Sequence, residues 1–289
     1  MNIYVNGEWY YFRDSSYPLG EGAMGIVYIG NSKSHHEKVA IKKIKKQFSN
    51  NLQIRKRILN EASMKFDNPH LVEMYGACEV DGIIYVVSKL VQGVDFNVFA
   101  SHKIRQMPNS VERICRLYLQ VLDALSYLHS RGILHLDIKP SNIMMENGSN
   151  LRLMDLGIAC EMNKINNDNS DVFWGTPKYA APEQFPNSLY AGISRATDIY
   201  QAGVTLFELL TGLNPFASQS LTEASMKHAS ICLPYVKGIP VELMDVLRRA
   251  TDPNPSNRFQ DVNDFRDAIE SSITKKKNIF SAFFSNFFR

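Results

Sequence analysis

Residues with the chemistry of a phosphate site begin near the start of the chain, in a glycine-rich segment. Residues 20–27 read GEGAMGIV, which places Gly20, Gly22 and Gly25 in the pattern G-x-G-x-x-G-x-V. Glycine has no Cβ, so backbone amides can approach a phosphate closely. A plain glycine-rich turn remains an alternative. The dinucleotide-binding form of the motif requires a following helix, and the β-branched run 26–29 argues against that form.

Five further short segments carry charged, amide or hydroxyl side chains. In order they are Val39–Lys42, His135–Asn142, Asp155–Gly157, Gly175–Pro177 and Ala181–Glu183. The second segment brings Asp137, Lys139 and Asn142 within six residues of one loop. A lysine at the end of an apolar strand, such as Lys42, is usually a surface residue, so no single segment decides the chemistry.

The elements that must position these residues change character along the chain. Runs of β-branched residues at 26–29, 39–41 and 83–87 predict strands, and one helical segment, 52–66, interrupts them. Beyond Gly93, apolar residues recur at spacings of three and four, which predicts a helix from an N-cap at Ser110 to Gly132. Further helices are expected at 196–210, 221–230, 240–250 and 261–272. Strands followed by helices predict an α+β chain with two lobes.

The composition is that of an ordinary globular protein, with 45% hydrophobic residues, 21% charged residues and a formal net charge of +3. This excludes a disordered chain or a strongly cationic one that coats nucleic acid. The basic excess lies in residues 275–289, which contain three Lys, one Arg and no acidic residue. The rest of the chain has a net charge of −1 and no basic stripe, so no nucleic-acid partner is expected.

Cysteine usage and the N-terminal residues indicate a cytoplasmic chain. The start has neither a basic nor an apolar signal region, and Asn2 stands where myristoylation requires glycine. The longest apolar run near the middle, 83–87, is far too short to span a membrane. The cysteines lack metal-site spacing and read as reduced side chains; they are Cys78, Cys115, Cys160 and Cys232.

Taken together, six motifs in order make residues 15–272 resemble the eukaryotic-type protein kinase family. The resemblance implies a two-lobed kinase fold, with an N-lobe at 15–88, a hinge at 89–93 and a C-lobe at 94–272. Residues 1–14 would form an N-terminal strand or extension. The implied activity is ATP- and Mg²⁺-dependent transfer of a phosphoryl group to Ser or Thr of protein substrates, with Mn²⁺ as an alternative metal.

The resemblance also assigns nucleotide-binding roles. The glycine-rich loop would cover the phosphates, and Lys42 would neutralise them while an ion pair with Glu61 holds it in place. Backbone groups of the hinge would bind the adenine edge. The full set expected at the nucleotide is Gly20, Glu21, Gly22, Gly25, Val27, Ala40, Lys42, Glu61, Ser88, Lys89, Val91, Asn142 and Asp155.

For the transfer itself, the resemblance implies that Asp137 orients the substrate hydroxyl and accepts its proton. Lys139 would stabilise charge on the transferring group, and Asn142 and Asp155 would hold the metal. Thr176 would contact Asp137. Supporting roles fall to Glu183 with Arg258 as a buried ion pair, to Asp198 as a brace for the catalytic loop, and to His135 as a packing residue beneath Asp155.

One departure from the family pattern bears on regulation. Leu136 replaces the Arg that usually precedes the catalytic Asp and pairs with a phosphorylated activation-loop residue. Leucine cannot make that pair, so activity is predicted not to require activation-loop phosphorylation, although Ser170 and Thr176 remain candidates for modification. Two alternatives stay open: a catalytically weak pseudokinase that acts as a scaffold, and a kinase for small molecules.

The tail at residues 275–289 differs from the rest of the chain, because it holds 5 of the 16 Phe as well as the basic excess. Apolar pairs recur every four residues and would form one broad helical face. Three interpretations compete: docking on a groove of the large lobe, an interfacial helix on an anionic membrane, and a site for a partner protein.

Overall fold

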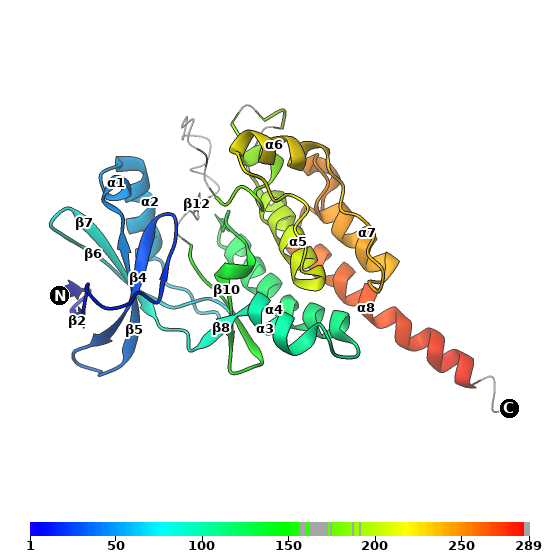
Figure 1. Cartoon of the computed structure of the whole chain (residues 1–289), viewed down its shortest axis with the longest axis horizontal. Helices are drawn as coiled ribbons and strands as arrows, with labels where there is room; N and C mark the ends of the chain where they lie inside the picture. The colour runs from blue at the N-terminus through cyan, green and yellow to red at the C-terminus, as the bar shows by residue number, and fades with distance from the viewer. Residues whose placement is uncertain (157–159, 162–172, 174, 187, 191, 286–289) are drawn as a thin grey trace.

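The chain folds into a small, strand-rich lobe and a larger, helical lobe (Figure 1), as the change from strand patterns to helix patterns predicts. The computed structural model describes residues 1–156, 160–161, 173, 175–186, 188–190 and 192–285; at Gln53, 160–161 and 275–285 it describes the backbone alone. Between the lobes, the predicted hinge 89–93 connects the end of one strand to the start of another.

A seven-stranded sheet forms the small lobe, in the order β1-β2-β4-β5-β7-β6, with β3 paired to β4. All these pairs are antiparallel. The three predicted strands are confirmed as β4, β5 and β7, each longer than its β-branched run. The bounds are β1 Asn2–Val5, β2 Glu8–Phe12, β3 Gly20–Glu21, β4 Gly25–Ser32, β5 Lys38–Ile44, β6 Met74–Val80 and β7 Ile83–Lys89. Two helices, α1 (Lys46–Ser49) and α2 (Leu52–Ser63), complete the lobe.

The first residues of the chain are part of this sheet and not an extension outside the domain. β1 and β2 form a hairpin, and β2 pairs with β4 through Tyr10↔Ser32 and its neighbours. Alternate hairpin side chains are buried because one face packs on the sheet core; they are Ile3, Val5, Tyr10 and Phe12. At the hairpin turn, Asn6 Nδ2 donates to Tyr75 O on β6 at 2.7 Å, so the hairpin reaches the far edge of the sheet.

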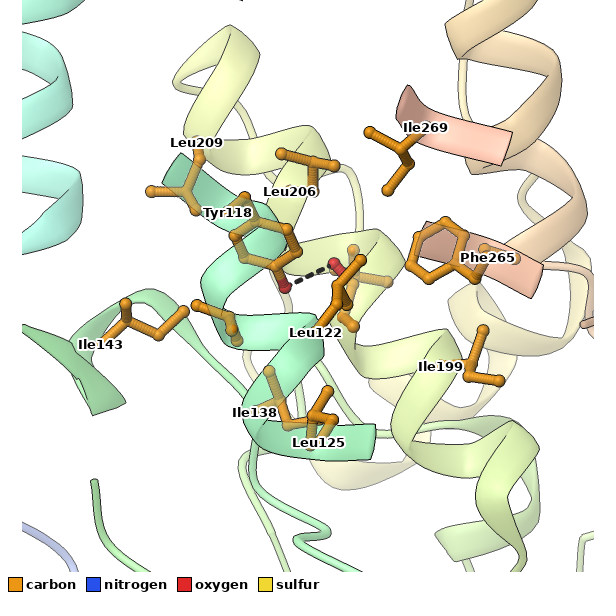
Figure 2. Packing of buried hydrophobic residues seen from close by; sticks show 14 of the residues in the cluster. Tyr118, Leu122, Leu125, Ile138, Ile143, Ile199, Leu206, Leu209, Phe265 and Ile269 are labelled. Carbon is orange, nitrogen blue, oxygen red and sulfur yellow. Dashed lines mark hydrogen bonds between the residues drawn. The ribbon is translucent and has the colours of Figure 1, made fainter. Parts of the chain in front are cut away.

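Helices dominate the large lobe, and α4 lies at its centre. The bounds are α3 Phe96–Phe99, a π-helical turn at Ala100–Ile104, α4 Ser110–Ser130, α5 Arg195–Thr211, α6 Leu221–Ser230, α7 Val241–Ala250 and α8 Val262–Ser285. Figure 2 shows Tyr118 and Leu122 of α4 among side chains of α5 and α8, and all of them are buried. The Tyr118 hydroxyl donates to Ala202 O on α5 at 2.9 Å, which satisfies the one polar atom of this side chain.

Short strands carry the loops of the large lobe. β8 (Gly93–Asp95), β10 (Ile143–Glu146) and β11 (Asn150–Leu153) form a three-stranded sheet, and β9 (Ile133–Leu134) pairs with β12 (Cys160–Glu161). The segment that follows β9 and the segment that follows β11 carry the candidate catalytic residues, so these strands fix where each segment begins.

Helix ends agree with the sequence in part. α5 ends at Gly212, where φ is 77°, a conformation that glycine adopts without strain. The N-cap predicted at Ser110 is wrong by one residue, because Ser110 is the first helical residue; Asn109 occupies the N-cap position with φ 60° and makes no side-chain capping bond. The last helix continues to Ser285, well past the predicted end at 272. No helix in the described part of the chain is both long enough and apolar enough to cross a membrane.

Candidate active site

Lys42 of β5 and Asp155, two residues beyond β11, meet between the two lobes. Lys42 Nζ donates to Asp155 Oδ1 in an ion pair. Asp155 has φ 58°, in the left-handed region that non-glycine residues seldom adopt. The backbone there is strained, and strain of this kind is typical of functional positions. The two residues assigned to the phosphates and the metal therefore lie together.

Each partner shifts the pKa of the other. Desolvation lowers the pKa of Lys42, and the negative charges of Asp155 and Glu61 more than offset this, so the pKa lies above its ordinary value. Desolvation raises the pKa of Asp155, but the charge and hydrogen bond of Lys42 more than compensate, so the pKa lies below its ordinary value. Both groups are ionised at neutral pH.

The predicted ion pair between Lys42 and Glu61 is wrong. Between these described residues no ion pair forms, since Lys42 is paired with Asp155 instead. Glu61 is nonetheless close to both, on α2, with only 5% of its surface exposed. Burial, followed by the charge of Asp155, raises the pKa of Glu61 to about 8. Asp155 competes for the same lysine, and it is the carboxylate that Lys42 reaches.

Asp137 is the centre of a hydrogen-bonded cluster in the loop that follows β9. Its Oδ1 accepts from Thr176 Oγ1 at 2.7 Å, and its Oδ2 accepts from Lys139 Nζ at 2.6 Å and from Asn142 Nδ2 at 3.3 Å. Lys139 Nζ also donates to Thr176 Oγ1 at 2.7 Å. The predicted contact between Thr176 and Asp137 is confirmed. A carboxylate held by three donors has a fixed orientation, which suits a group that must receive a hydroxyl proton.

Gly20 and Gly22 have free space on the side where a Cβ would stand. A Cβ built at either position meets no atom within 4 Å, whereas one at Gly25 would lie 2.5 Å from Lys43 O. The glycine at position 25 is therefore required by packing within the lobe. The other two are not required by any contact of the chain itself, which fits a bound phosphate group close to the backbone. Glu21, expected at the same site, forms an ion pair with Lys45 at 2.8 Å.

The residues expected around adenine lie on three neighbouring strands, β4, β5 and β7, and on the segment that follows β7. Ala40 lies directly opposite Ser88, and Val27 of β4 lies opposite Lys42. The backbone N–H of Lys89 donates to Glu73 O at 2.9 Å. That N–H is thus not available to a base, and the hydrogen bonds predicted for the hinge must come from its other backbone groups, including those of Val91.

The donor set suits a magnesium ion shared with phosphates. Asn142 and Asp155 offer amide and carboxylate oxygens, which are the hard ligands that Mg²⁺ prefers. Asn142 is 5% exposed, and its amide nitrogen is committed to Asp137 O at 2.8 Å, so its orientation is fixed. Within the described residues, no cluster of three or more His, Cys, Asp or Glu side chains could hold a metal alone. Sites of one or two carboxylates completed by phosphates are the usual form for Mg²⁺.

The predicted brace for the catalytic loop is confirmed. Asp198 of α5 is fully buried; its Oδ1 accepts from Leu136 N at 2.8 Å and its Oδ2 from His135 N at 2.9 Å. His129 Nε2 makes a further hydrogen bond to Asp198 at 2.8 Å. His135 is also fully buried, and burial lowers its pKa. Its Nε2 hydrogen-bonds to Met154 O at 3.1 Å and its Nδ1 accepts from Asp137 N at 3.3 Å, so both ring nitrogens are used within the loop.

The predicted ion pair between Glu183 and Arg258 is confirmed as well. It is bidentate, with Nη1 to Oε1 at 2.7 Å and Nη2 to Oε2 at 2.9 Å, and both side chains are fully buried. Thr197 Oγ1 donates to the same carboxylate at 2.7 Å. The pair fixes the turn that ends the segment containing Thr176.

Sequence reasoning missed two glutamines that contact the catalytic loop, Gln184 and Gln201. Each is buried. The sequence offered one signal for each: Gln201 is a polar residue inside the apolar helical pattern 196–210, and Gln184 directly follows Ala181–Glu183. Two residues named from the sequence, Gly157 and Ser170, lie outside the described part of the chain.

A family model described as "Protein kinase domain" matches residues 14–271. Among solved structures, the kinase domain of Mycobacterium tuberculosis PknI has a similar fold, with a TM-score of 0.70 at 24% identity. That match covers 94% of this chain and 97% of the other.

Curated relatives are similar over most of this chain. Serine/threonine-protein kinase PrkC of Bacillus subtilis is 28% identical over 261 residues, which are 88% of this chain and 39% of PrkC. CBL-interacting protein kinase 4 of Oryza sativa is 31% identical over 245 residues, 83% of this chain and 53% of that protein. The chain thus spans between about two fifths and about half of the length of these relatives.

Proposed function

This chain belongs to the protein kinase family, and from that premise we propose that it is an ATP- and Mg²⁺-dependent protein serine/threonine kinase. The observation that carries the proposal is the hydrogen-bonded cluster of Asp137, Lys139 and Thr176. It lies close enough to the Lys42–Asp155 pair that the charge of Asp137 raises the pKa of Lys42 and the charge of Lys139 lowers that of Asp155. Of the curated relatives named above, PrkC is described as a serine/threonine-protein kinase and the rice protein as a CBL-interacting protein kinase.

Each side chain has a role that follows from its position. Lys42 holds its charge where the α- and β-phosphates of ATP would lie under the glycine-rich loop. Asp137 orients the hydroxyl of the substrate and takes its proton at a carboxylate oxygen. Lys139, in contact with both Asp137 and Thr176, provides positive charge beside the transferring group.

Asn142 and Asp155 would hold the metal, which when bound neutralises negative charge on the phosphates. The chain's own contribution is to keep these two oxygen donors fixed. Asn142 does this through its hydrogen bond to the backbone of Asp137, and Asp155 through its ion pair with Lys42. Either Mg²⁺ or Mn²⁺ suits oxygen donors of this type.

Asp137→Asn tests the proposal. With radiolabelled ATP, Mg²⁺ and casein as a generic protein substrate, the wild type should label Ser and Thr. The variant should lose at least about a hundredfold in rate, since general-base catalysis contributes on that order. Asp81→Asn, in the exposed turn between β6 and β7, is the matched control and should keep full activity. Full activity in Asp137→Asn would show that the assignment is wrong.

The same assay separates the two alternatives. A scaffold without activity would transfer nothing from ATP under any metal, and a small-molecule kinase would label metabolites but not casein. The presence of Lys42, Asp137 and Asp155 together argues against the scaffold. The segments Gly175–Pro177 and Ala181–Glu183, which shape a peptide-binding floor in the family, argue against a small substrate.

Activity is proposed to be independent of activation-loop phosphorylation. The Leu136 side chain is 3% exposed and apolar, so it offers no positive charge to a phosphate. Phosphatase-treated enzyme should therefore retain its rate, and so should Ser170→Ala. Loss of activity in Ser170→Ala with the fold intact would contradict this.

We further propose that residues 275–289 hold the kinase at an anionic membrane surface. The sequence supports this through four basic residues and five Phe, and the backbone of α8 continues as a helix to Ser285, extending away from the large lobe in Figure 1. Deletion of 275–289 should abolish sedimentation with vesicles of phosphatidylserine and phosphatidylcholine while leaving kinase activity unchanged. Equal binding by the shortened chain would contradict the membrane proposal, and its unfolding would favour docking on the lobe.

A further inference from the structure

The backbone on both sides of Asp137 is held by buried side chains. Leu136, which precedes it, has φ 66°, a left-handed conformation that is unfavourable for a residue with a Cβ. Its N–H donates to Asp198, as described above. A strained residue keeps such a conformation only where its surroundings determine it.

Gln201 of α5 bridges the residues that flank Asp137. Its Nε2 donates to Leu136 O at 2.8 Å, and its Oε1 accepts from Ile138 N at 2.9 Å. The side chain is 1% exposed, so no water competes for these groups. One amide side chain thus fixes the carbonyl before Asp137 and the N–H after it.

Gln184 adds a second contact from the end of the segment that contains Thr176. Its Nε2 donates to Leu136 O at 3.1 Å, and its Oε1 accepts from Ala181 N at 2.8 Å. The two glutamines are joined directly, because Gln201 Nε2 donates to Gln184 Oε1 at 2.7 Å. The neighbouring Glu183 is anchored by Arg258, so Gln184 extends from a rigid turn.

We propose that Gln184 and Gln201 form a clasp that positions Asp137 and couples it to the end of the activation segment. The clasp consists of the four hydrogen bonds that these two side chains make to Leu136, Ile138 and Ala181, together with the bond between them. In the family, an Arg at position 136 usually pairs with a phosphorylated residue of the activation loop, and this pair orders the catalytic loop. Here the neutral amides of the clasp order the loop instead. Both glutamines are positioning residues, since neither touches the reacting atoms. The inference rests on the proposed kinase function.

A glutamine with the same bonding pattern but a more exposed side chain serves as the control. Gln120 of α4 donates through Nε2 to Ser149 O at 2.9 Å and accepts through Oε1 from Leu151 N at 2.8 Å. It therefore brackets Asn150 as Gln201 brackets Asp137, but at a place remote from the catalytic loop. Methionine is close to glutamine in size and makes neither bond.

The experiment compares Gln201→Met, Gln184→Met and Gln120→Met in phosphatase-treated enzyme. Leaving buried backbone groups unpaired should lower kcat of Gln201→Met by about tenfold or more, with KM for ATP within about twofold of wild type. Gln184→Met should lose less, because Gln201 still pairs with both Leu136 O and Ile138 N. The double variant should lose less than the product of the two single losses. Gln120→Met should keep kcat within about twofold.

Hydrogen exchange of the Ile138 amide gives a second readout that does not depend on turnover. Exchange should accelerate by about tenfold or more in Gln201→Met and stay unchanged in Gln120→Met. If Gln201→Met is folded, turns over at the wild-type rate and protects Ile138 as well as wild type does, the proposal is overturned. If Gln201→Met does not fold, Gln184→Met decides, and an unchanged kcat there overturns the proposal. If wild type transfers no phosphate, the kinase function fails, and Ile138 exchange alone decides whether the clasp holds the loop.

Discussion

Replacing Arg258 by Met should be among the most destabilising single changes in the large lobe. The guanidinium is fully buried and makes the bidentate pair with Glu183. It also donates to three backbone carbonyls, those of Asp252 at 2.7 Å, Ala196 at 3.0 Å and Pro253 at 3.0 Å. Methionine fills similar volume and replaces none of these bonds.

The size of the destabilisation follows from the buried Glu183 carboxylate, which loses its positively charged partner. In the variant the Glu183 carboxylate stays buried with Thr197 Oγ1 as its remaining side-chain donor. Removing one partner of a buried ion pair typically costs about 3–5 kcal/mol, because the other charge is left uncompensated. A domain has about 5–15 kcal/mol of stability in total, so Arg258→Met should lose a large share of it.

Urea unfolding followed by circular dichroism measures this loss. Arg266→Met is the control, since Arg266 pairs with Asp123 at 2.7 Å but is 29% exposed, and an exposed pair contributes about 1 kcal/mol or less. The double variant Glu183→Leu with Arg258→Met should be more stable than Arg258→Met alone, because it removes the stranded charge. A loss below about 1 kcal/mol in Arg258→Met, or a double variant less stable than the single one, would refute the reasoning.

Three further predictions concern the site and the core. Glu61→Gln should flatten the dependence of the free energy of unfolding on pH. The pKa of Glu61 is about 8 in the folded chain against 4.5 in the unfolded chain, so the protonated carboxyl stabilises the fold fully below pH 4.5. This contribution, on the order of a few kcal/mol, is lost as the pH rises from 4.5 to 8. Urea unfolding at pH 5, 7 and 9 checks it, and an unchanged slope would count against a buried protonated Glu61. Thr176→Val should lower kcat/KM for casein about tenfold or more, because it removes the hydroxyl between Asp137 and Lys139, whereas Thr176→Ser should keep most of it; equal rates for the two variants would contradict this. Tyr118→Phe should destabilise the large lobe by about 1–2 kcal/mol by removing its buried hydrogen bond, measured as a lower Tm, and an unchanged Tm would contradict that role.

Local pattern was sufficient for most of the secondary structure. The β-branched runs predicted β4, β5 and β7, the three- and four-residue spacing predicted α4, and an apolar run predicted α5, because side-chain pattern and burial are linked within one element. The hairpin at residues 2–12 belongs to the sheet for a reason outside its own residues, namely pairing with β4. Its place could not be predicted from alternation alone.

In the candidate site, too, some contacts depend on parts of the chain that the local sequence does not show. Motif order brought Asp137, Lys139, Asn142 and Thr176 into one cluster correctly. The partner of Lys42 was wrong because two carboxylates from opposite lobes compete for it, and the outcome depends on how the lobes are arranged. The glutamine clasp was not predicted, because the sequence does not show which polar residues of a helix are buried and must therefore find hydrogen-bond partners.

The N-terminal hairpin has a consequence for any shortened form of this chain. The match to the family model begins at residue 14, yet Phe12 is buried. Its ring centroid lies 5.5 Å from that of Tyr28 and 5.8 Å from that of Tyr85. A fragment cut at that boundary would expose these aromatic faces and leave the β4 edge without its partner strand. Unpaired edges beside apolar surface recruit other chains. Such a fragment would be prone to aggregation although it keeps every motif of the family, because the cut passes through a continuous core.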